Sequence, residues 1–217
     1  MRKILTPRVT PLLALTFALA GSVGLISRQS GDTPLVARQV AVTPAVSNVA
    51  GAVTDALPDV AIETASGAHT HFAATDGYVR VVTLFYSHCP GVCPMTIDTL
   101  RDIDRKLSAQ QRAKLHFVLL SLDPARDTPA ALRTVAVERE IDSRRWLLGR
   151  TAAQDVAAVA AAARIQYRPL SDGSIDHSTA LVLLDTNGRV LTRTGDVDDP
   201  AAFVTAVRAA IDATGAR

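Results

Sequence analysis

The stretch VRVVTLFYSHCPGVCPMTIDTL, residues 79–100, decides the fold of this chain. Its first part, residues 79–86, is rich in β-branched and aromatic side chains and almost continuously apolar, which is typical of a strand buried on both faces. Pro94 favours the first turn of a helix. The apolar residues on one face of that helix follow at helical spacing: Ile97, Leu100, Ile103 and Leu107. The stretch therefore predicts a buried strand, a loop that carries two cysteines, and a helix.

Strand and helix patterns alternate on both sides of this unit. Upstream, residues 60–63 and 70–73 predict a short hairpin around a turn at Ser66-Gly67. Downstream, the sequence predicts strands at 115–122, 146–148, 181–184 and 189–192, and helices after Thr128, after a capping box at Thr151–Gln154 and after Asp199. A βαβ alternation that ends in a hairpin and a helix indicates an α/β fold. We expect a thioredoxin-like mixed sheet flanked by helices on both faces, with an N-terminal hairpin extension and an antiparallel final hairpin.

The composition fits one substantial domain and excludes several classes of protein. The chain has 217 residues, of which 48% are hydrophobic and 20% charged, and its two cysteines exclude a scaffold of several disulfides. The net charge of +2 includes three basic residues in the first eight positions. Without them, the chain has 20 basic residues (23 − 3 = 20) and 21 acidic ones, a net charge of −1. A body without a basic excess is not expected to bind nucleic acid.

The N-terminus has the pattern of an export signal or a membrane anchor. Its basic residues precede an uncharged run from Val9 to Ile26. Ala18-Leu19-Ala20 fits a cleavage site, whereas the whole run is about long enough to span a bilayer, so residues 1–27 are predicted to be a cleaved signal or a retained anchor. The basic flank predicts that the body is exported to the periplasmic side of the cytoplasmic membrane.

Two further segments follow. Residues 28–57 contain no aromatic residue and have proline, serine and glycine at short intervals, which predicts a flexible linker. Residues 58–217 contain all the strand and helix patterns, and we expect them to form the folded domain. If the anchor is retained, the linker gives this domain reach along the membrane surface.

Cys89 and Cys93 are the only cysteines of the chain, and they lie four positions apart at a strand-to-helix turn. The N-terminus of a helix favours the thiolate, which is both the nucleophilic and the metal-binding form of cysteine. The spacing also permits a disulfide between the two residues. Closing so small a loop stabilises the fold by only about 2 kcal/mol, so a purely structural disulfide is the weaker interpretation.

His177 precedes the apolar run at 181–184. An antiparallel strand begins at the sheet edge where a parallel strand ends, so the topology predicts that His177 meets Cys89 and Cys93. Two thiolates and one imidazole suit three-coordinate Cu(I), and they accept Cu(II) with an added ligand. Zinc also takes such ligands but would then keep an open fourth position with water.

The sequence resembles the Sco/SenC family of copper-binding assembly factors for cytochrome c oxidase. Three motifs carry the resemblance, in the family's order: FYSHCPGVCP at 85–94, SLDPARDTP at 121–129 and DHS at 176–178. It covers about residues 58–195, and the segment at 144–150 departs from the family's usual glycine- and threonine-bearing pattern. The resemblance implies a thioredoxin-like domain that binds one copper through Cys89, Cys93 and His177. It also implies that the protein helps to metallate the CuA site on oxidase subunit II, outside the cytoplasmic membrane.

Two acidic residues lie close to the predicted ligands. Asp123 follows the strand at 115–122 and is expected at the edge of the sheet that carries the cysteines, where it would orient His177 or the cysteine loop. The alternative is that Asp123 and Asp127 cap the next helix and its turn. Asp176 has the same two interpretations, as a support for a metal ligand or as a residue of the turn.

The remaining histidines are weaker candidates. His69 and His71 alternate on a predicted strand and therefore share a face, so they form either an auxiliary metal site or a solvent-facing pair. His88 adjoins Cys89, but its side chain is expected to point elsewhere. His116 lies within a buried-looking strand and is expected to be structural.

Two functions share this fold and these cysteines. The first is copper delivery by a metallochaperone without catalytic turnover, with the oxidase subunit, other copper chaperones or a thiol reductant as partners. The second is an exported thiol-disulfide reductase that acts on the oxidase cysteines through Cys89 and Cys93. A peroxidase of the same fold lacks a distinct motif. His177 discriminates between the first two, because copper needs the imidazole and reduction does not, and we expect the metallochaperone rather than the enzyme.

Overall fold

The computed structural model describes residues 56–215, so the predicted signal or anchor and nearly all of the predicted linker lie outside the described residues. Within 56–215, no helix is long and apolar enough to cross a membrane. The strands are β1 (Ala61–Thr64), β2 (His69–His71), β3 (Val79–Phe85), β4 (Leu115–Ser121), β5 (Trp146–Arg150), β6 (Tyr167–Pro169), β7 (Ile175–His177), β8 (Leu181–Leu184) and β9 (Val190–Thr194). The helices are η1 (Phe72–Thr75, 3₁₀), α1 (Val92–Arg105), α2 (Ala109–Arg112), α3 (Pro129–Glu138), α4 (Ala153–Ala163) and α5 (Ala201–Ala213).

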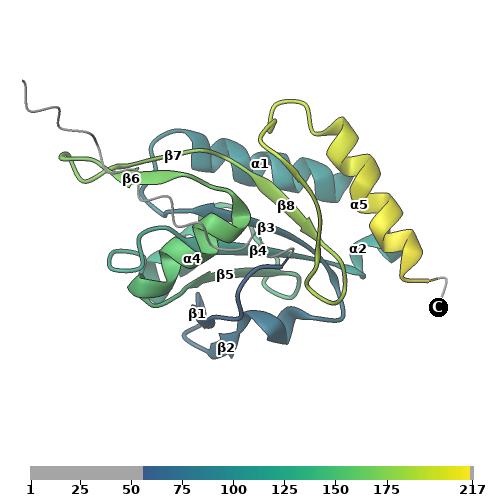
Figure 1. Ribbon diagram of the computed structural model, residues 1–217, viewed down its shortest axis with the longest axis horizontal. Coiled ribbons are helices and arrows are strands. Elements are labelled where there is room, and N and C mark those ends of the chain that lie inside the picture. Colours follow the sequence, from purple (N-terminus) through teal and green to yellow (C-terminus); the bar gives the residue numbers. More distant parts are fainter. Residues whose placement is uncertain (1–55, 216–217) are drawn as a thin grey trace, which may run out of the picture. The chain divides into compact units, whose positions relative to one another are not determined.

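Seven of the strands form one mixed sheet in the order β2-β1-β5-β4-β3-β8-β9 (Figure 1). The three central strands β3, β4 and β5 are parallel, whereas β8 and β9 at one end and β1 and β2 at the other join in antiparallel pairs. The predicted thioredoxin-like mixed sheet, its N-terminal hairpin extension and the antiparallel final hairpin are therefore confirmed. Strands β6 and β7 form a separate two-stranded sheet.

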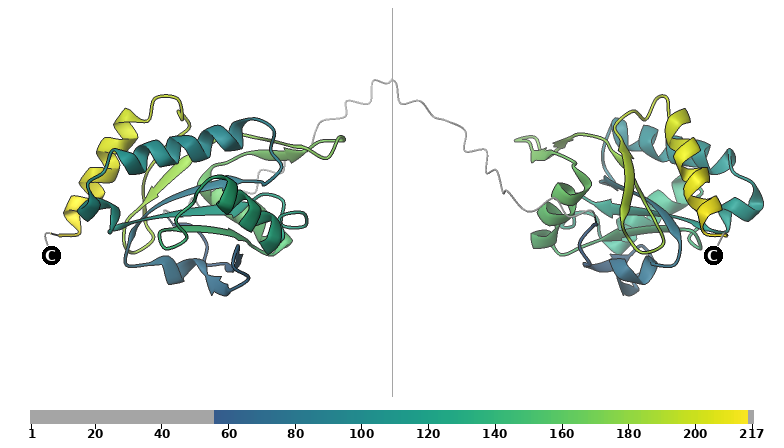
Figure 2. Two further views of the ribbon diagram at one scale, coloured as in Figure 1. Left: turned by 180° about the vertical axis from the view of Figure 1, so that it is seen from behind. Right: turned by 45° about the vertical axis from the view of Figure 1, so that its right-hand side comes forward.

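Helices cover both faces of the main sheet (Figure 2). On one face, the end of α1 is joined to the middle of α5 by a hydrogen bond from Arg208 to the carbonyl of Lys106. An ion pair between Arg101 and Glu140 joins α1 to the segment that follows α3. Helix α4 lies on the opposite face. Because both faces are covered, the central strands must be apolar on both sides, and all seven residues of β3 are buried.

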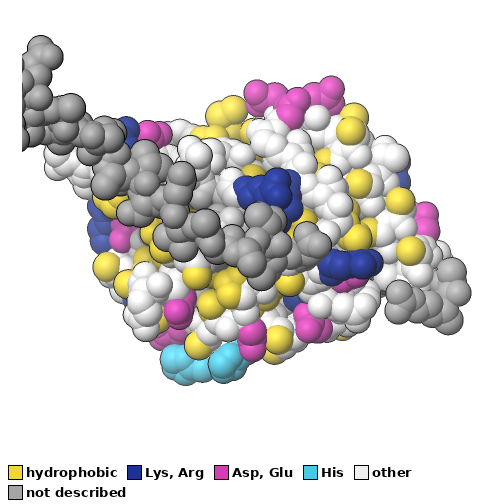
Figure 3. All heavy atoms as spheres, viewed as in Figure 1, with side chains coloured by type: hydrophobic (Ala, Val, Ile, Leu, Met, Phe, Trp, Pro, Cys, Tyr) yellow, Lys and Arg dark blue, Asp and Glu magenta, His cyan; other side chains and the backbone are white. Residues whose placement is uncertain are grey.

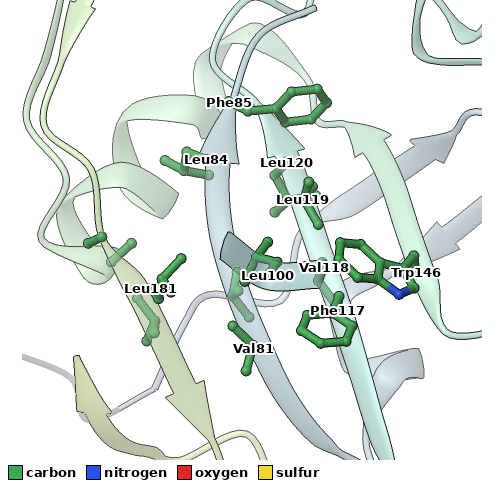
Figure 4. Packing of buried hydrophobic residues seen from close by; sticks show 14 of the residues in the cluster. Val81, Leu84, Phe85, Leu100, Phe117, Val118, Leu119, Leu120, Trp146 and Leu181 are labelled. Carbon is green, nitrogen blue, oxygen red and sulfur yellow. The ribbon is translucent and has the colours of Figure 1, made fainter. Parts of the chain in front are cut away.

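The core lies between the central strands and the helices (Figure 4). Val81 pairs with Phe117 in the parallel register, and the ring of Phe117 stacks on that of Trp146, with 4.0 Å between centroids. Leu100 of α1 is completely buried, as the helical spacing predicts. This packing makes the carboxyl ends of β3 and β4 a rigid edge from which the next loops start.

One buried charge interrupts the apolar strand β3. The Arg80 side chain is completely buried, and its guanidinium meets the carboxylate of Asp76 at 2.7 Å and the hydroxyl of Thr75 at 2.8 Å. Burial lowers the pKa of Arg80, and the Asp76 carboxylate opposes that shift. The guanidinium also lies 5.2 Å from the centroid of the Phe72 ring. These partners contact both terminal nitrogens of the guanidinium, and Nε has no hydrogen-bond partner among residues 56–215. They tie η1 to the sheet at the end of β3 opposite to the cysteine loop.

Four local details differ from the sequence predictions. The short helix α2 was not predicted, whereas α1 begins at Val92 with Pro94 in its first turn, as predicted. Helix α4 has Ala152 as its N-cap without a side-chain hydrogen bond, so the predicted capping box at Thr151–Gln154 is wrong: the Thr151 hydroxyl donates to the Ala152 carbonyl instead. Strands β6 and β7 were also not predicted, and His177 ends β7 rather than beginning the strand that contains Leu181.

Candidate metal centre

The cysteine loop connects the end of β3 to the start of α1. Gly91 is the N-cap of α1, and Cys93 lies in the first helical turn. Pro94 is tolerated there because the backbone amides of a first turn have no partner within the helix. Cys93 is 3% exposed and Cys89 is half-buried, and both thiols are free. The loop therefore presents one accessible and one buried sulfur at the carboxyl edge of the sheet.

The two thiols differ in acidity. Burial opposes ionisation of Cys89, but hydrogen bonds from the Gly91 amide, from Cys93 and from the Tyr86 hydroxyl outweigh it and hold the pKa of Cys89 below its ordinary value. Burial raises the pKa of Cys93, and the neighbouring Cys89 and the Asp127 carboxylate raise it further. The expected effect of the helix N-terminus is thus overcome by burial at Cys93, and the thiolate belongs to Cys89.

His177 completes the group from the other side. Its Nε2 atom lies 3.4 Å from the Sγ atom of Cys93, although 84 residues separate them. Its Nδ1 atom lies 3.1 Å from the carbonyl oxygen of Ser178, which accepts a hydrogen bond from the Nδ1–H group and leaves Nε2 as the free ligand atom. The ligand atoms of Cys89, Cys93 and His177 all lie within 4.8 Å of one another. The topology therefore brings together the three residues that the sequence analysis selected.

This donor set fits a soft metal ion. Two sulfurs and one imidazole nitrogen match the ligand preference of copper, and one ion can contact all three at these separations. Among residues 56–215 no other group of three or more histidine, cysteine or carboxylate side chains could hold a metal ion. The three residues would hold the ion in a shallow position, because Cys89 and His177 are only partly buried.

The buried carboxylate of Asp127 forms hydrogen bonds that hold the cysteine loop against the end of β4. Asp127 is completely buried and accepts hydrogen bonds from the Ser87 amide at 3.1 Å, from the Ser87 hydroxyl at 2.6 Å and from the Ser121 hydroxyl at 2.5 Å. These bonds join β4 and the start of α3 to the residue two positions before Cys89. Sequence analysis treated Asp127 as a helix-capping residue, whereas Thr128 is the N-cap of α3. No sequence signal separated the two roles.

The two proposed supporting carboxylates take different places. Asp123 lies 3.2 Å from Nε2 of His88 and also pairs with Arg126, so it contacts the cysteine loop rather than His177. Asp176 forms an exposed ion pair with Arg168 at 3.1 Å. The structure thus places Asp123, but not Asp176, against a residue next to a candidate ligand.

The remaining histidines lie away from the centre. His69 and His71 are both exposed on β2, and His71 lies 3.9 Å from a carboxylate oxygen of Asp59. Figure 3 shows histidine side chains at the outer edge of the molecule beside β2. His116 stacks on Tyr78 with 3.7 Å between ring centroids, and burial lowers its pKa. His116 thus packs against a neighbouring side chain, as a structural residue does.

Fold and site together define a thioredoxin-like protein with a Cys-Cys-His group at the carboxyl edge of its sheet. The family model "SCO1/SenC" matches residues 61–212. The chain therefore belongs to the SCO1/SenC family.

Known relatives agree with this assignment. The mitochondrial protein SCO2 of Saccharomyces cerevisiae is 28% identical over 144 residues, which is 63% of this chain and 46% of the relative, so the match spans about half of that protein. The copper-bound structure of ScoI from Bradyrhizobium japonicum has a TM-score of 0.60 at 20% identity and covers 71% of this chain and 99% of its own. BsSco, described as a member of the Sco family of cytochrome c oxidase assembly proteins with a disulfide switch, has a TM-score of 0.62 at 20% identity and covers 72% of this chain and 94% of its own.

Proposed function

We propose that this protein is a copper metallochaperone that binds one copper ion through Cys89, Cys93 and His177 and helps to metallate the CuA site of cytochrome c oxidase. The observation that carries the proposal is the meeting of the His177 Nε2 atom with the Cys93 sulfur at 3.4 Å. A dithiol reductase needs no imidazole at that point, whereas a copper site does. The copper-bound state of ScoI and the description of BsSco as an oxidase assembly protein support both parts of the proposal.

The residues of the site have separate tasks in this function. Cys89, which is the more accessible and more acidic thiol, meets the incoming ion first, and the buried Cys93 and the half-buried His177 then enclose it. Copper is a soft, redox-active ion, and the two sulfurs and the imidazole of this site are ligands that such an ion prefers. Because two of the three ligands are only partly buried, an acceptor protein can reach the site and exchange its own thiolates for them.

The experiment is metal analysis of the full chain after anaerobic reduction and addition of copper. We expect one copper per chain, and a loss of binding in Cys89→Ser, Cys93→Ser and His177→Ala. His71→Ala is a matched control, because His71 is an exposed histidine outside the group. Unchanged copper stoichiometry and affinity in His177→Ala would refute the proposal.

A thiol-disulfide reductase is the second candidate, and one observation favours it. The accessible Cys89 has a lowered pKa and the buried Cys93 a raised pKa, which is the asymmetry of an attacking and a resolving thiol. In that reaction the Cys89 thiolate attacks a disulfide of the substrate, and the Cys93 thiol then releases the reduced substrate as the Cys89–Cys93 disulfide forms. Reduction of an oxidised CuA-type peptide that is as fast in His177→Ala as in the wild type would support this function over copper delivery.

We also propose where the protein works. The basic flank and uncharged run of residues 1–27 support a position of the domain on the periplasmic side of the cytoplasmic membrane, and the composition of residues 28–57 supports a linker with reach toward the oxidase subunit. Tethering raises the effective concentration of the domain at the oxidase subunit. Metal transfer needs this because the complex between donor and acceptor must be weak enough to dissociate after the copper has moved. Cell fractionation with N-terminal sequencing tests this: a soluble product that begins at Gly21 would refute the tether, and a cytoplasmic product would refute export.

A further inference from the structure

His177 is carried by an arm outside the main sheet. Strands β6 and β7 pair only with each other and project away from the seven-stranded sheet (Figure 1). The two cysteines, in contrast, follow directly from the buried strand β3. The geometry of the centre therefore depends on contacts that hold the arm, the β6–β7 hairpin, against the cysteine loop.

The backbone of β7 turns one of its edges toward that loop. In the arm, the Ser174 carbonyl accepts from the Leu170 amide and the Ser178 amide donates to the Gln166 carbonyl. Backbone groups of an antiparallel strand alternate in direction, so the amides and carbonyls of residues 175 and 177 point away from β6, whereas those of residue 176 point toward it. Ile175 is such a residue, and it is 8% exposed. Its amide and its carbonyl both need a partner, because unpaired buried backbone groups destabilise a fold.

Tyr86 provides that partner. Its hydroxyl oxygen lies 3.3 Å from the Ile175 amide nitrogen and 3.3 Å from the Ile175 carbonyl oxygen, so it can accept from one and donate to the other. Tyr86 is 3% exposed and follows β3 directly, three residues before Cys89. Its ring meets the His177 ring edge-on, with 5.8 Å between centroids. One side chain therefore contacts the arm two residues before the candidate ligand and at the ring of that ligand.

We propose that Tyr86 is a positioning residue, whose hydroxyl takes the place of a neighbouring strand at the free edge of β7 and fixes His177 over the two cysteines. This role rests on the proposed copper function, since it concerns the third ligand of that site. Arg126 is a second attachment, because its guanidinium donates to the carbonyl of Gly173 at the turn of the arm. That bond keeps the tip of the arm in place when the phenol is removed, so a Tyr86→Phe variant is expected to fold.

The first measurement needs no metal. We compare amide hydrogen exchange in the copper-free full chain with that of Tyr86→Phe, and we expect the Ile175 amide to exchange at least about tenfold faster in the variant, which matches the loss of about one hydrogen bond. Tyr167→Phe is the matched control: Tyr167 lies on β6 directly opposite His177, and its hydroxyl has no hydrogen-bond partner within residues 56–215. Equal protection of Ile175 in the wild type and in Tyr86→Phe would overturn the proposal.

The second measurement is a double-mutant cycle on Cu(I) affinity, determined by competition with a Cu(I) chelator. We expect Tyr86→Phe to weaken binding about tenfold in the wild type and to have no effect in the His177→Ala background, because the phenol acts through the imidazole. An equal effect in both backgrounds would overturn the proposal, since it would mean that Tyr86 acts on the cysteine loop and not through the imidazole.

The two proposals fail in different ways. A wild-type protein that takes up no copper, or a His177→Ala variant that binds it as tightly as the wild type, refutes the copper function and with it the task assigned to Tyr86. Wild-type copper binding that needs His177, together with an unchanged affinity in Tyr86→Phe, refutes the positioning role alone. Unchanged binding and exchange in Tyr167→Phe show that the loss of a tyrosine hydroxyl from the arm has no general effect.

Discussion

The cysteine loop and the β6–β7 arm each bring candidate ligands to the same point, but they are held in different ways. The loop leaves a completely buried strand and rests on the buried carboxylate of Asp127. The arm has its own two-stranded sheet, in which the one side-chain ion pair, between Arg168 and Asp176, is exposed. Two candidate ligands thus follow directly from a central strand, whereas the third depends on side-chain contacts that attach the arm to the domain. Under the proposed copper function, changes to the loop and changes to the arm should therefore affect the centre differently.

Oxidation gives the largest effect, because it changes the loop and leaves the arm intact. A Cys89–Cys93 disulfide consumes both thiolates, and one imidazole alone does not hold copper. We expect oxidised protein to take up no copper until a reductant is added, as measured by metal analysis after gel filtration. Equal uptake by the fully disulfide-bonded protein would contradict the division of ligands between loop and arm.

Removal of Asp127 is expected to have the next largest effect. Asp127→Ala leaves the Ser87 amide and the Ser87 and Ser121 hydroxyls without their buried partner, and we expect the free energy of unfolding to fall by about 3 kcal/mol. Urea denaturation measures the change. Asp98→Ala is the control, because Asp98 is exposed and its contact with Arg139 is 3.8 Å long. A loss no larger than that of the control would mean that Asp127 does not support the loop.

The asymmetry within the loop predicts a difference in reactivity. Because the pKa of Cys89 is lowered from its ordinary value and burial raises the pKa of Cys93, Cys89 carries the thiolate at a pH at which Cys93 stays protonated. At neutral pH we expect iodoacetamide to alkylate Cys89 at least about tenfold faster than Cys93, since one pKa unit corresponds to a factor of ten. Peptide mapping by mass spectrometry reads out both sites, and equal rates would show that burial does not separate the two thiols.

The loop was more predictable from sequence than the arm, and the reason is physical. An apolar strand, two cysteines and a proline-led helix lie within 22 consecutive residues, from Val79 to Leu100, so local patterns specify them. The topology of the sheet then predicted the meeting with His177. Strands β6 and β7 have three residues each, which is shorter than the about four to eight residues over which an alternating pattern indicates a strand.

The support of the site was not predictable, because it depends on contacts between distant residues. The sequence predicts Tyr86 as the last residue of a buried strand. Nothing in the sequence indicates that its hydroxyl forms a hydrogen bond with the backbone of Ile175, 89 residues away. Asp127 likewise precedes a helix in the sequence, and a carboxylate at such a position ordinarily caps the N-terminus of the helix. Its hydrogen bond with Ser87, which is 40 residues away, is not indicated by the sequence. Such roles follow from the three-dimensional arrangement alone.

The smallest effect is expected on the arm, at Asp176. Side chains alternate along a strand, so Asp176 points away from the face that Ile175 and His177 share, and its carboxylate meets Arg168, its direct cross-strand partner. Both side chains are largely exposed, with relative exposures of 62% and 72%, and exposed ion pairs contribute little. We therefore expect Asp176→Asn to change the free energy of unfolding by less than about 0.5 kcal/mol and to leave the copper affinity within about twofold of wild type. A tenfold loss of copper affinity would instead give Asp176 the task of orienting His177, and the arm would then be held by its surface charges rather than by the phenol of Tyr86.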